Sequence, residues 1–592
     1  MKQDVNDAGW DLETLVYGKG ASGAEELMAE AHRRAEELSK QKGTVADFDG
    51  DRLKGFMDEL AAISDALERA GCYAGLHFSV DMRDESRGAL LQKIDEQSTQ
   101  IQTMLLFFDL EWAALSEDKV DELLEHQGLD LYRHHLRSER RYKDHLLTEP
   151  EEKIMIEKSI TGASAWNRLF GELASAITVQ LPGGEVPLEE ALSKLASPER
   201  EVRKETQEAV TQALGEGLKT RTFIFNTLLH DKAVNDRLRR FPSWVAGRNL
   251  SNEASDESVQ ALVDSVQSRY DIPRRWYTLK SQLLGHPLKD YDRMAPVTDD
   301  DVEVEWADAK GIVLDGYRSF SPELAELCAQ FFDDHWIDAP LRPGKRTGAF
   351  CSYTVPSHHP YIMLNWTARR RDVLTLAHEL GHGVHAALAR PKGIFHQSTP
   401  LTVAETASVF GETIVFGQLL EQAESAESRL SLLAEKVEGA IATVFRQTAM
   451  NRFEDAVHTA RRTEGELSIE RFGELWAKSQ RDMLGDSVEV TDNYKSWWSY
   501  VHHFIGVPGY VYAYAYGQLL ALSVYSEYEK RGADFVPSYL EMLSAGGSMP
   551  PEELAKIAGV DLTDPDFWNG GLGIIDQQLS LAEAAAKEAG RI

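Results

Sequence analysis

The chain has 592 residues, of which 43% are hydrophobic and 27% are charged, and its net charge is −33. This length exceeds that of one ordinary domain, so we expect two lobes. The acidic balance disfavours a nucleic-acid partner and is typical of a solvated surface. With only three cysteines, the chain shows no disulfide framework, which favours a reducing compartment, and we expect the cytoplasm.

The ends and the apolar stretches of the chain do not read as membrane signals. The N-terminal MKQDVNDAGWDLE is acidic and lacks the apolar core of a secretory signal. The one long apolar run, 509–525, is dominated by tyrosines and small residues and also contains Gln518 and Ser523. We therefore predict a buried helix there, with no membrane partner.

Most of the chain has the period of amphipathic helices, which predicts a mainly α fold. In one of these segments, Ser197 is the expected N-cap and Pro198 the first helical residue. The longest helical segments are 24–40, 53–70, 198–214, 256–284 and 430–461.

Strand signals occur in two places only. Residues 178–187 read as a hairpin around Pro-Gly-Gly, and we place the junction of the two lobes there. The predicted division is an N-terminal helical lobe, 1–195, and a catalytic domain, 196–592. A second strand region, 349–354 and 361–366, predicts a small sheet.

The loop that leads into this second strand region is rich in glycine. Gly344 and Gly348 would let it flex or approach a ligand closely, and Arg346 could meet a carbonyl or a carboxylate. An exposed strand edge beside a catalytic site could also pair with an extended peptide backbone. The alternative is a plain turn with a solvated arginine.

The most informative motif is HExxH, formed by His378, Glu379 and His382. Residues i and i+4 share one helix face, so both imidazoles can reach one zinc ion, with Glu379 beside it as a candidate general base. Apolar residues around the motif predict a largely buried helix, which Pro391 and Gly393 end.

A zinc enzyme of this type needs a third protein ligand. The metzincin pattern requires glycine and histidine three and six residues after His382, where this chain has His385 and Leu388. His385 lies about 10 Å along the helix axis from His378, too far for both to share one ion easily. We interpret His385 as a packed residue or a support for the ligands.

Glu405, in the segment LTVAETASVFGE, is the better candidate for the third ligand. The segment predicts a helix that starts near Thr402, and a carboxylate from an adjacent helix would complete a His, His, Glu set. Glu412 lies two turns further on the same face and could accept a hydrogen bond from a ligand imidazole.

HELGH followed by VAETASVFGE resembles oligoendopeptidase F, of the thimet-oligopeptidase superfamily of zinc metallopeptidases. The resemblance covers nearly the whole chain and implies one zinc ion per chain and a narrow channel that admits short unfolded peptides. Further segments that resemble the family in the same order are 10–17, 147–153, 165–170, 291–296, 336–339, 344–350 and 359–365.

The C-terminal segment YVHHFIGVPGYVYAYAYG could supply hydrogen-bond donors to the oxyanion of peptide hydrolysis. The resemblance assigns that role to His503 and Tyr510, with Tyr514 one turn further on. The family often has an aromatic residue where this chain has Gly509, which blurs the register. The alternative is that all the tyrosines are core aromatics.

Together these features predict two helical lobes around a deep substrate channel, with a zincin-type catalytic core and a small β-sheet at the cleft. The predicted activity is zinc-dependent endoproteolysis of short unfolded peptides. Two alternatives stay open: a helical zinc carboxypeptidase, and a catalytically silent peptide-binding protein of the same fold. The sequence does not indicate the oligomeric state or the preferred cleavage site.

Overall fold

The computed structural model describes residues 5–159, 161–298 and 302–592, and it divides into two compact units. Unit 1 comprises Met1–Lys143, Asp301–Leu419 and Glu527–Asp561. Unit 2 comprises Asp144–Asp300, Leu420–Ser526 and Leu562–Ile592. The boundary predicted at residue 195 lies within the first segment of unit 2 and stays a prediction.

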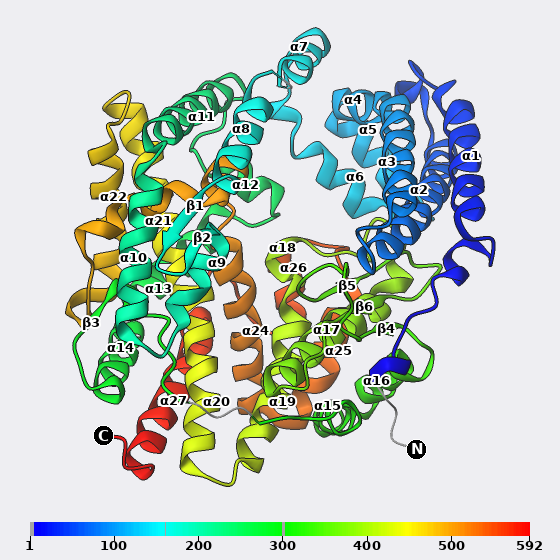
Figure 1. Cartoon of the computed structure of the whole chain (residues 1–592). Helices are drawn as coiled ribbons and strands as arrows, with labels where there is room; N and C mark the ends of the chain where they lie inside the picture. The colour runs from blue at the N-terminus through cyan, green and yellow to red at the C-terminus, as the bar shows by residue number, and fades with distance from the viewer. Residues whose placement is uncertain (1–4, 160, 299–301) are drawn as a thin grey trace. The chain divides into compact units, whose positions relative to one another are not determined.

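The predicted mainly helical fold with a few small sheets is confirmed (Figure 1). The predicted arrangement of lobes around a channel stays a prediction. Within the described residues, no helix combines the length and the apolar character that crossing a bilayer requires. The three cysteines, Cys72, Cys328 and Cys351, are free thiols.

Unit 1 is built from an N-terminal helical layer and a second group of helices around a small sheet. Three of the elements named next are divided between the units. Helix α19 lies in unit 1 up to Leu419, whereas η4 and α24 contribute only Lys143 and residues 527–531 to unit 1, and their other residues belong to unit 2. Its elements are η1 (Val5–Asp7), η2 (Glu13–Val16), α1 (Gly20–Ser39), η3 (Val45–Asp47), α2 (Gly50–Ser79), α3 (Glu85–Leu105), α4 (Phe107–Ala114), α5 (Glu117–Leu124), α6 (Arg133–Arg140), η4 (Lys143–His145), α15 (Trp306–Phe320), α16 (Pro322–Asp333), β4 (Ile337–Asp338), β5 (Phe350–Ser352), β6 (Tyr361–Met363), α17 (Arg370–Ala389), η7 (Arg390–Lys392), α18 (Leu401–Ala404), α19 (Thr406–Gln422), α24 (Tyr512–Arg531), η11 (Gly532–Phe535), α25 (Val536–Ala545) and α26 (Pro551–Ile557).

Unit 2 is almost entirely helical. Its elements are α7 (Glu149–Ser159), α8 (Ala163–Ser175), β1 (Thr178–Leu181), β2 (Gly184–Pro187), α9 (Leu188–Ser193), η5 (Lys194–Ala196), α10 (Arg200–Gly215), α11 (Leu218–Leu238), α12 (Ala246–Ser251), α13 (Asp256–Ser268), α14 (Asp271–Leu284), β3 (Leu288–Lys289), η6 (Asp290–Asp292), α20 (Ala426–Ala440), the π-helical turn η8 (Ile441–Phe445), α21 (Arg446–Thr463), α22 (Ile469–Leu484), η9 (Gly485–Ser487), β7 (Val488–Glu489), η10 (Asp492–Tyr500), α23 (His502–Gly506) and α27 (Pro565–Glu588).

The described residues form three sheets, all of them small. The predicted hairpin is present as the antiparallel pair β1–β2, with Val179 opposite Val186. The second predicted strand region forms a three-stranded sheet in the order β4-β6-β5, in which β5 is an edge strand. Strands β3 and β7 form the third sheet, as a short parallel pair. Helix α17 packs on β5 and β6, so the small sheet and the HExxH helix form one framework (Figure 1).

Two details of the predicted helices are wrong. The third long helix begins at Arg200 with Glu199 as N-cap, because the Ser197 hydroxyl oxygen instead accepts a hydrogen bond from the Glu199 N–H at 3.2 Å and closes a turn. The segment 256–284 forms two helices, α13 and α14. Pro273 has no N–H to donate to the carbonyl four residues earlier, so the helical hydrogen bonds are interrupted there.

Candidate active site

Helix α17 carries the HExxH motif, and its start is fixed by a local capping interaction. The carboxylate of Asp372 accepts hydrogen bonds from the backbone N–H groups of Thr367 and Arg369, at 2.7 and 3.1 Å. These bonds satisfy two backbone N–H groups that precede the first turn of the helix. The negative charge of Asp372 also interacts favourably with the positive end of the helix dipole. The HExxH residues therefore lie on a largely buried helix whose N-terminus is stabilised by a capping interaction.

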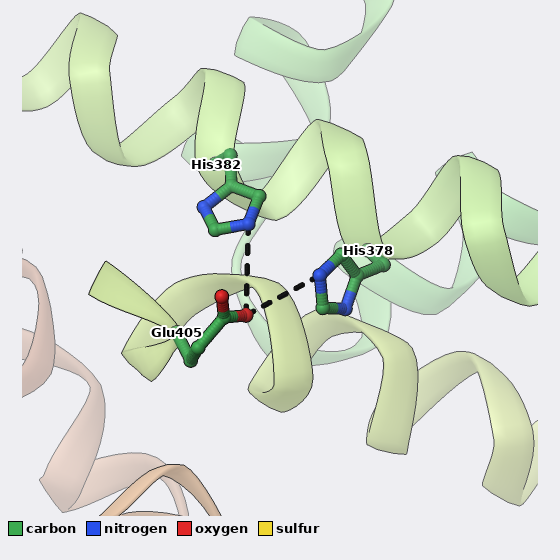
Figure 2. A group of neighbouring side chains, drawn as sticks. All are labelled: His378, His382 and Glu405. Carbon is green, nitrogen blue, oxygen red and sulfur yellow. Dashed lines mark ion pairs between the residues drawn. The ribbon is translucent and has the colours of Figure 1, made fainter. Parts of the chain in front are cut away.

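The structure brings His378, His382 and Glu405 together. Glu405 Oε2 lies 3.3 Å from His378 Nε2 and 3.6 Å from His382 Nε2. One ligand atom from each residue lies within 4.8 Å of the others. Figure 2 shows both imidazoles directed at the same oxygen of Glu405.

This donor set fits a zinc ion. Two imidazole nitrogens and one carboxylate oxygen are the protein ligands of thermolysin-type sites. Ligands bound tetrahedrally at about 2.0–2.1 Å lie about 3.3–3.4 Å apart, and the two nitrogen–oxygen separations here are close to that value. The three residues can therefore hold one zinc ion with little rearrangement.

Glu405 lies between two helices, and a neighbouring serine orients it. The predicted helix of this segment is interrupted: α18 ends at Ala404, and α19 begins at Thr406. Ser408 donates its hydroxyl to Glu405 Oε2 at 2.7 Å. This is the oxygen that faces both histidines (Figure 2). The bond from Ser408 therefore restricts the rotamer of the carboxylate.

Two glycines of α17 allow neighbouring segments to approach the helix closely. A β-carbon at Gly381 would lie 2.4 Å from both Ala407 O and Ser408 Cα, backbone atoms that cannot rotate away. At Gly383 it would lie 2.4 Å from the ring of Phe331. Gly381 therefore lets the segment that carries Glu405 approach α17 closely enough to complete the ligand set.

Further side chains hold the two imidazoles. Glu412 Oε2 lies 3.1 Å from His378 Nδ1, the interaction expected from the sequence, and leaves Nε2 of His378 directed at Glu405. The Tyr353 hydroxyl lies 3.4 Å from His382 Nδ1. Bonds of this kind select the tautomer and the ring orientation of a metal-binding histidine.

His385, which was expected to support the ligands, is 3% exposed. Its Nδ1 has no hydrogen-bond partner among the described residues. Burial lowers the pKa of His385 to about 3, so the ring is neutral at physiological pH. These observations favour the interpretation as a packed residue, and the supporting role of His385 stays a prediction.

Charges at the site are strongly coupled. Burial opposes charge on His378, but hydrogen bonds to Glu405 and Glu412 outweigh it and raise the pKa of His378 to about 10. Burial lowers the pKa of His382 to about 4 in spite of the nearby Glu405. Burial opposes ionisation of Glu405, but its hydrogen bond to His378 and the charge of His378 outweigh burial and lower the pKa of Glu405 to about 2.

Glu379 lines a cavity of about 560 Å³ together with the candidate ligands. Its side chain is largely buried, and burial, with the nearby carboxylate of Glu405, raises its pKa to about 7. A carboxylate of this basicity suits proton transfer near neutral pH. The residues that line the cavity are His378, Glu379, His382, Ala404 and Glu405, the β5 residues Phe350 and Cys351, their neighbours Ala349 and Tyr353, and Ser398 and Thr399.

The glycine-rich loop before β5 is exposed at Arg346 and Gly348. The guanidinium of Arg346 lies over the ring of Phe350, 5.1 Å from its centroid, and Phe350 lines the cavity. Gly348 has φ +82°, which favours glycine, and its carbonyl accepts a bond from Asn365 Nδ2 at 2.8 Å. The loop therefore has a defined shape beside the edge strand.

In unit 2, the three predicted C-terminal site residues form one cluster. His503 Nε2 lies 3.2 Å from the Tyr514 hydroxyl. The rings of His503 and Tyr510 are parallel at 5.9 Å, and Tyr510 and Tyr514 meet edge to face at 5.1 Å. Burial and the adjacent His502 lower the pKa of His503, so its ring is neutral at physiological pH.

The other two tyrosines of the run 510–516, Tyr512 and Tyr516, have a different environment. Tyr512 and Tyr516 are fully buried; Tyr512 accepts a bond from Asn252 at 3.0 Å, and Tyr516 donates to Ser258 at 3.3 Å. The tyrosines of 510–516 are thus divided between the core and the half-buried cluster around His503.

Three side chains at the site were not predicted from the sequence: Ser408, Tyr353 and Cys351. Ser408 follows Glu405 by three residues, a spacing that could have suggested a partner for the carboxylate. Tyr353 and Cys351 lie in the predicted strand region, but no motif indicates which of its residues face the HExxH helix.

Comparison with known proteins gives two family matches. Residues 322–574 match the model of peptidase family M3, and residues 111–178 match the N-terminal model of oligopeptidase F. Together the two models span more than half of the chain. The first includes all the candidate zinc ligands, together with Glu379, His503 and Tyr510.

Individual relatives agree with these matches. The chain is 28% identical to oligopeptidase PepF of Bacillus subtilis, over 92% of this chain and 82% of the relative. It is 24% identical to an oligoendopeptidase F homologue of Lactococcus lactis, over 97% and 96%.

Solved structures share the fold. A putative peptidase from Chlamydophila abortus superposes with a TM-score of 0.86 at 21% identity, covering 99% of this chain and 100% of the other. Oligoendopeptidase-F from Enterococcus faecium superposes with a TM-score of 0.72 at 22% identity, covering 95% and 98%.

Proposed function

Because this chain belongs to peptidase family M3, with the N-terminal region of oligopeptidase F, we propose that it is a zinc-dependent endopeptidase of short unfolded peptides. The observation that carries the proposal is the convergence of His378, His382 and Glu405, with Glu379 in the same cavity. The names of the relatives, oligopeptidase and oligoendopeptidase, support a peptide substrate of limited length.

The proposed cofactor is one zinc ion per chain, held by His378 Nε2, His382 Nε2 and Glu405 Oε2. When bound, zinc would act as a Lewis acid toward water and the peptide carbonyl. Glu412, Ser408 and Tyr353 would keep the three ligands in their orientations.

Glu379 is the proposed general base and acid. Its carboxylate would accept a proton from the attacking water and then deliver it to the nitrogen of the departing amine. A group that must both take and give a proton needs a pKa near the working pH, and the pKa of Glu379 is raised to about 7.

His503 and Tyr510 are the proposed donors to the oxyanion, with Tyr514 as a neighbour that contacts the substrate. A neutral imidazole and a phenol each have one proton to donate, and donors aimed at developing charge are among the larger contributions to catalysis. This assignment rests on the family resemblance and on the clustering of the three side chains in unit 2.

We further propose that the free edge of β5 binds the peptide backbone. Strand β5 pairs with β6 on one side, and its residues Phe350 and Cys351, with the adjacent Ala349 and Tyr353, line the cavity that contains Glu379. Backbone pairing gives affinity without selecting side chains, and Arg346 and Gly348 lie in the loop that precedes this edge. We expect no nucleic-acid or membrane partner, and a cytoplasmic location.

A peptide blocked at both ends tests the activity most simply. The zinc-loaded protein should cut it internally, and mass spectrometry of the products should locate the cut. A carboxypeptidase would leave the doubly blocked peptide intact and trim its free-ended counterpart stepwise. A silent peptide-binding protein would retain the peptide without turnover. A folded protein added to the same reaction should stay intact.

A further inference from the structure

The tyrosine cluster of unit 2 is preceded by a tight turn at Val507–Tyr510. The Tyr510 N–H donates to the Val507 carbonyl at 3.1 Å. Pro508 and Gly509 occupy the two central positions, and Gly509 has φ +75°. Proline followed by a glycine of positive φ is the signature of a type II turn. The departure from the family at Gly509 therefore has a structural reason: the turn requires glycine there.

Type II and type I turns differ mainly in the orientation of the central peptide group, here the peptide between Pro508 and Gly509. Glycine tolerates both forms, so the local sequence alone leaves this peptide free to flip. A flip would reverse the directions of the Pro508 carbonyl and the Gly509 N–H. Something outside the turn must select one orientation.

Two side chains from other helices bind the two ends of this peptide. The Gly509 N–H donates to Glu454 Oε1 of α21 at 2.9 Å. The Pro508 carbonyl accepts from Arg248 Nε of α12 at 3.2 Å. An acceptor on one side and a donor on the other match only one orientation of the peptide. After a flip, both side chains would lose their partners.

Of the two side chains that bind this peptide, Glu454 lies in an unfavourable environment for a carboxyl group. Glu454 is fully buried, and its Oε2 has no hydrogen-bond partner among the described residues. Burial raises the pKa of Glu454 to about 8. A buried carboxyl group with one unpaired oxygen lowers the stability of the fold. The presence of Glu454 here is explained if its contact with the turn has a function.

Packing closes the remaining space around the turn. A β-carbon on Gly509 would lie 3.3 Å from the ring of Trp244 and 3.4 Å from Arg248 Cβ. Trp244 is held in turn: its ring stacks on His458 at 4.3 Å, and its Nε1 donates to Asp455 at 2.8 Å. The turn therefore packs against a tryptophan side chain that is itself held in place by other contacts.

We propose that Glu454 and Arg248 are positioning residues that hold the Pro508–Gly509 peptide in its type II orientation and thereby set the direction of Tyr510. The inference rests on the proposed catalytic role of Tyr510. Tyr510 follows the peptide directly, and its carbonyl accepts the N–H of Ala513 at the start of α24. Rotation of the peptide would move the ring relative to His503 and Tyr514.

The test compares two substitutions of one residue in the zinc-loaded enzyme. Glu454→Gln keeps a carbonyl oxygen that can accept the Gly509 N–H, so its kcat should stay within about twofold of wild type. Glu454→Met keeps length and burial but removes the acceptor, and should lower kcat about 10- to 100-fold with KM little changed, as expected for a misplaced catalytic group. Tyr516→Phe, which removes a buried hydrogen bond elsewhere on α24, is the matched control and should be neutral.

A double-mutant cycle separates positioning from general loss of structure. If Glu454 acts through Tyr510, Glu454→Met should add almost nothing in a Tyr510→Phe background. Equal effects of Glu454→Met in both backgrounds, or equal effects of Gln and Met at position 454, would overturn the inference. If Glu454→Met does not fold, the same cycle with Arg248→Met replaces it, with the same expected non-additivity.

The outcomes also distinguish this inference from the proposed function. A silent Tyr510→Phe would remove the catalytic role of Tyr510 and, with it, the basis of the inference. A damaging Tyr510→Phe together with a silent Glu454→Met would leave the proposed function standing and refute the positioning role alone.

Discussion

Gly381→Ala should separate α17 from the segment that carries Glu405 and thereby weaken zinc binding. The added β-carbon would lie 2.4 Å from Ala407 O and Ser408 Cα. Ordinary contacts between such atoms are about 3.4 Å or longer, so the two segments must move apart by about 1 Å. Neither contacted atom belongs to a side chain that could rotate away.

The energetic balance can be worked from the same contacts. Overpacking of this kind costs about 1–3 kcal/mol. Replacing a helical glycine by alanine returns about 1 kcal/mol, so we expect a net loss of up to about 2 kcal/mol in the free energy of unfolding. A displacement of about 1 Å exceeds the roughly 0.5 Å that a functional site tolerates, so zinc affinity should fall at least about tenfold.

Competition with a chromogenic chelator would measure zinc affinity, and thermal unfolding of the metal-free protein would measure stability. Gly417→Ala is the matched control, because it lies in α19 and its added β-carbon would contact nothing within 4 Å. That variant should bind zinc as wild type does and be slightly more stable. Wild-type zinc affinity in Gly381→Ala would refute the close-approach argument.

Three further predictions follow from the site and its surroundings. Glu379→Gln should keep the bound zinc and lose at least about 10²- to 10⁴-fold in kcat, measured on a short peptide; near-normal turnover would exclude Glu379 as the base. Tyr510→Phe should lower kcat about 10²- to 10³-fold, whereas Tyr512→Phe, whose hydroxyl is bound to Asn252 in the core, should not; the reverse result would show that the register is wrong. Burial raises the pKa of Glu454 from its usual 4.5 to about 8, so the folded state holds an extra proton between these values. The contribution of Glu454 to stability should therefore fall as the pH rises through that window, by at most about 1.4 kcal/mol per pH unit. Chemical unfolding from pH 5 to 8 should show that the stability of wild type relative to Glu454→Gln falls as the pH rises, and parallel curves for the two proteins would refute this prediction.

The sequence was most informative where one helix carries the chemistry. The spacing of His378 and His382 places both imidazoles on one face whatever the tertiary structure, and the buried pattern around them required a helix. The third partner was harder to predict, because Glu405 comes from another element. It is predicted from the residue types around it and from its place on an adjacent helix, and the family resemblance supports the choice.

What the sequence could not supply were contacts that depend on how elements pack. Gly381 reads as a mild helix-weakening residue until the backbone at Ala407 is placed beside it. Gly509 looked like a departure from the family, and its role became clear only with Glu454 and Arg248 at the turn. Both cases involve residues far apart in the chain, which periodicity cannot connect.

The predicted start of the helix at Pro198 is wrong for a local reason. Ser197 has the composition of an N-cap, but its hydroxyl closes a preceding turn, and the helix begins three residues later at Arg200. Serine can satisfy either pattern at similar cost, so residue type alone does not decide between them. The hairpin at 178–187 was predictable because Pro-Gly-Gly between two alternating segments leaves few other structures.

The most direct test of the central claim is peptide cleavage measured against bound zinc in the same samples. Metal-free protein should be inactive, and activity should rise in proportion to bound zinc and reach its maximum at one ion per chain. His378→Ala should neither retain the ion nor cleave the peptide, whereas Glu379→Gln should bind one ion without turnover. Full activity without zinc, or a zinc-loaded His378→Ala variant that cleaves the peptide normally, would contradict the account.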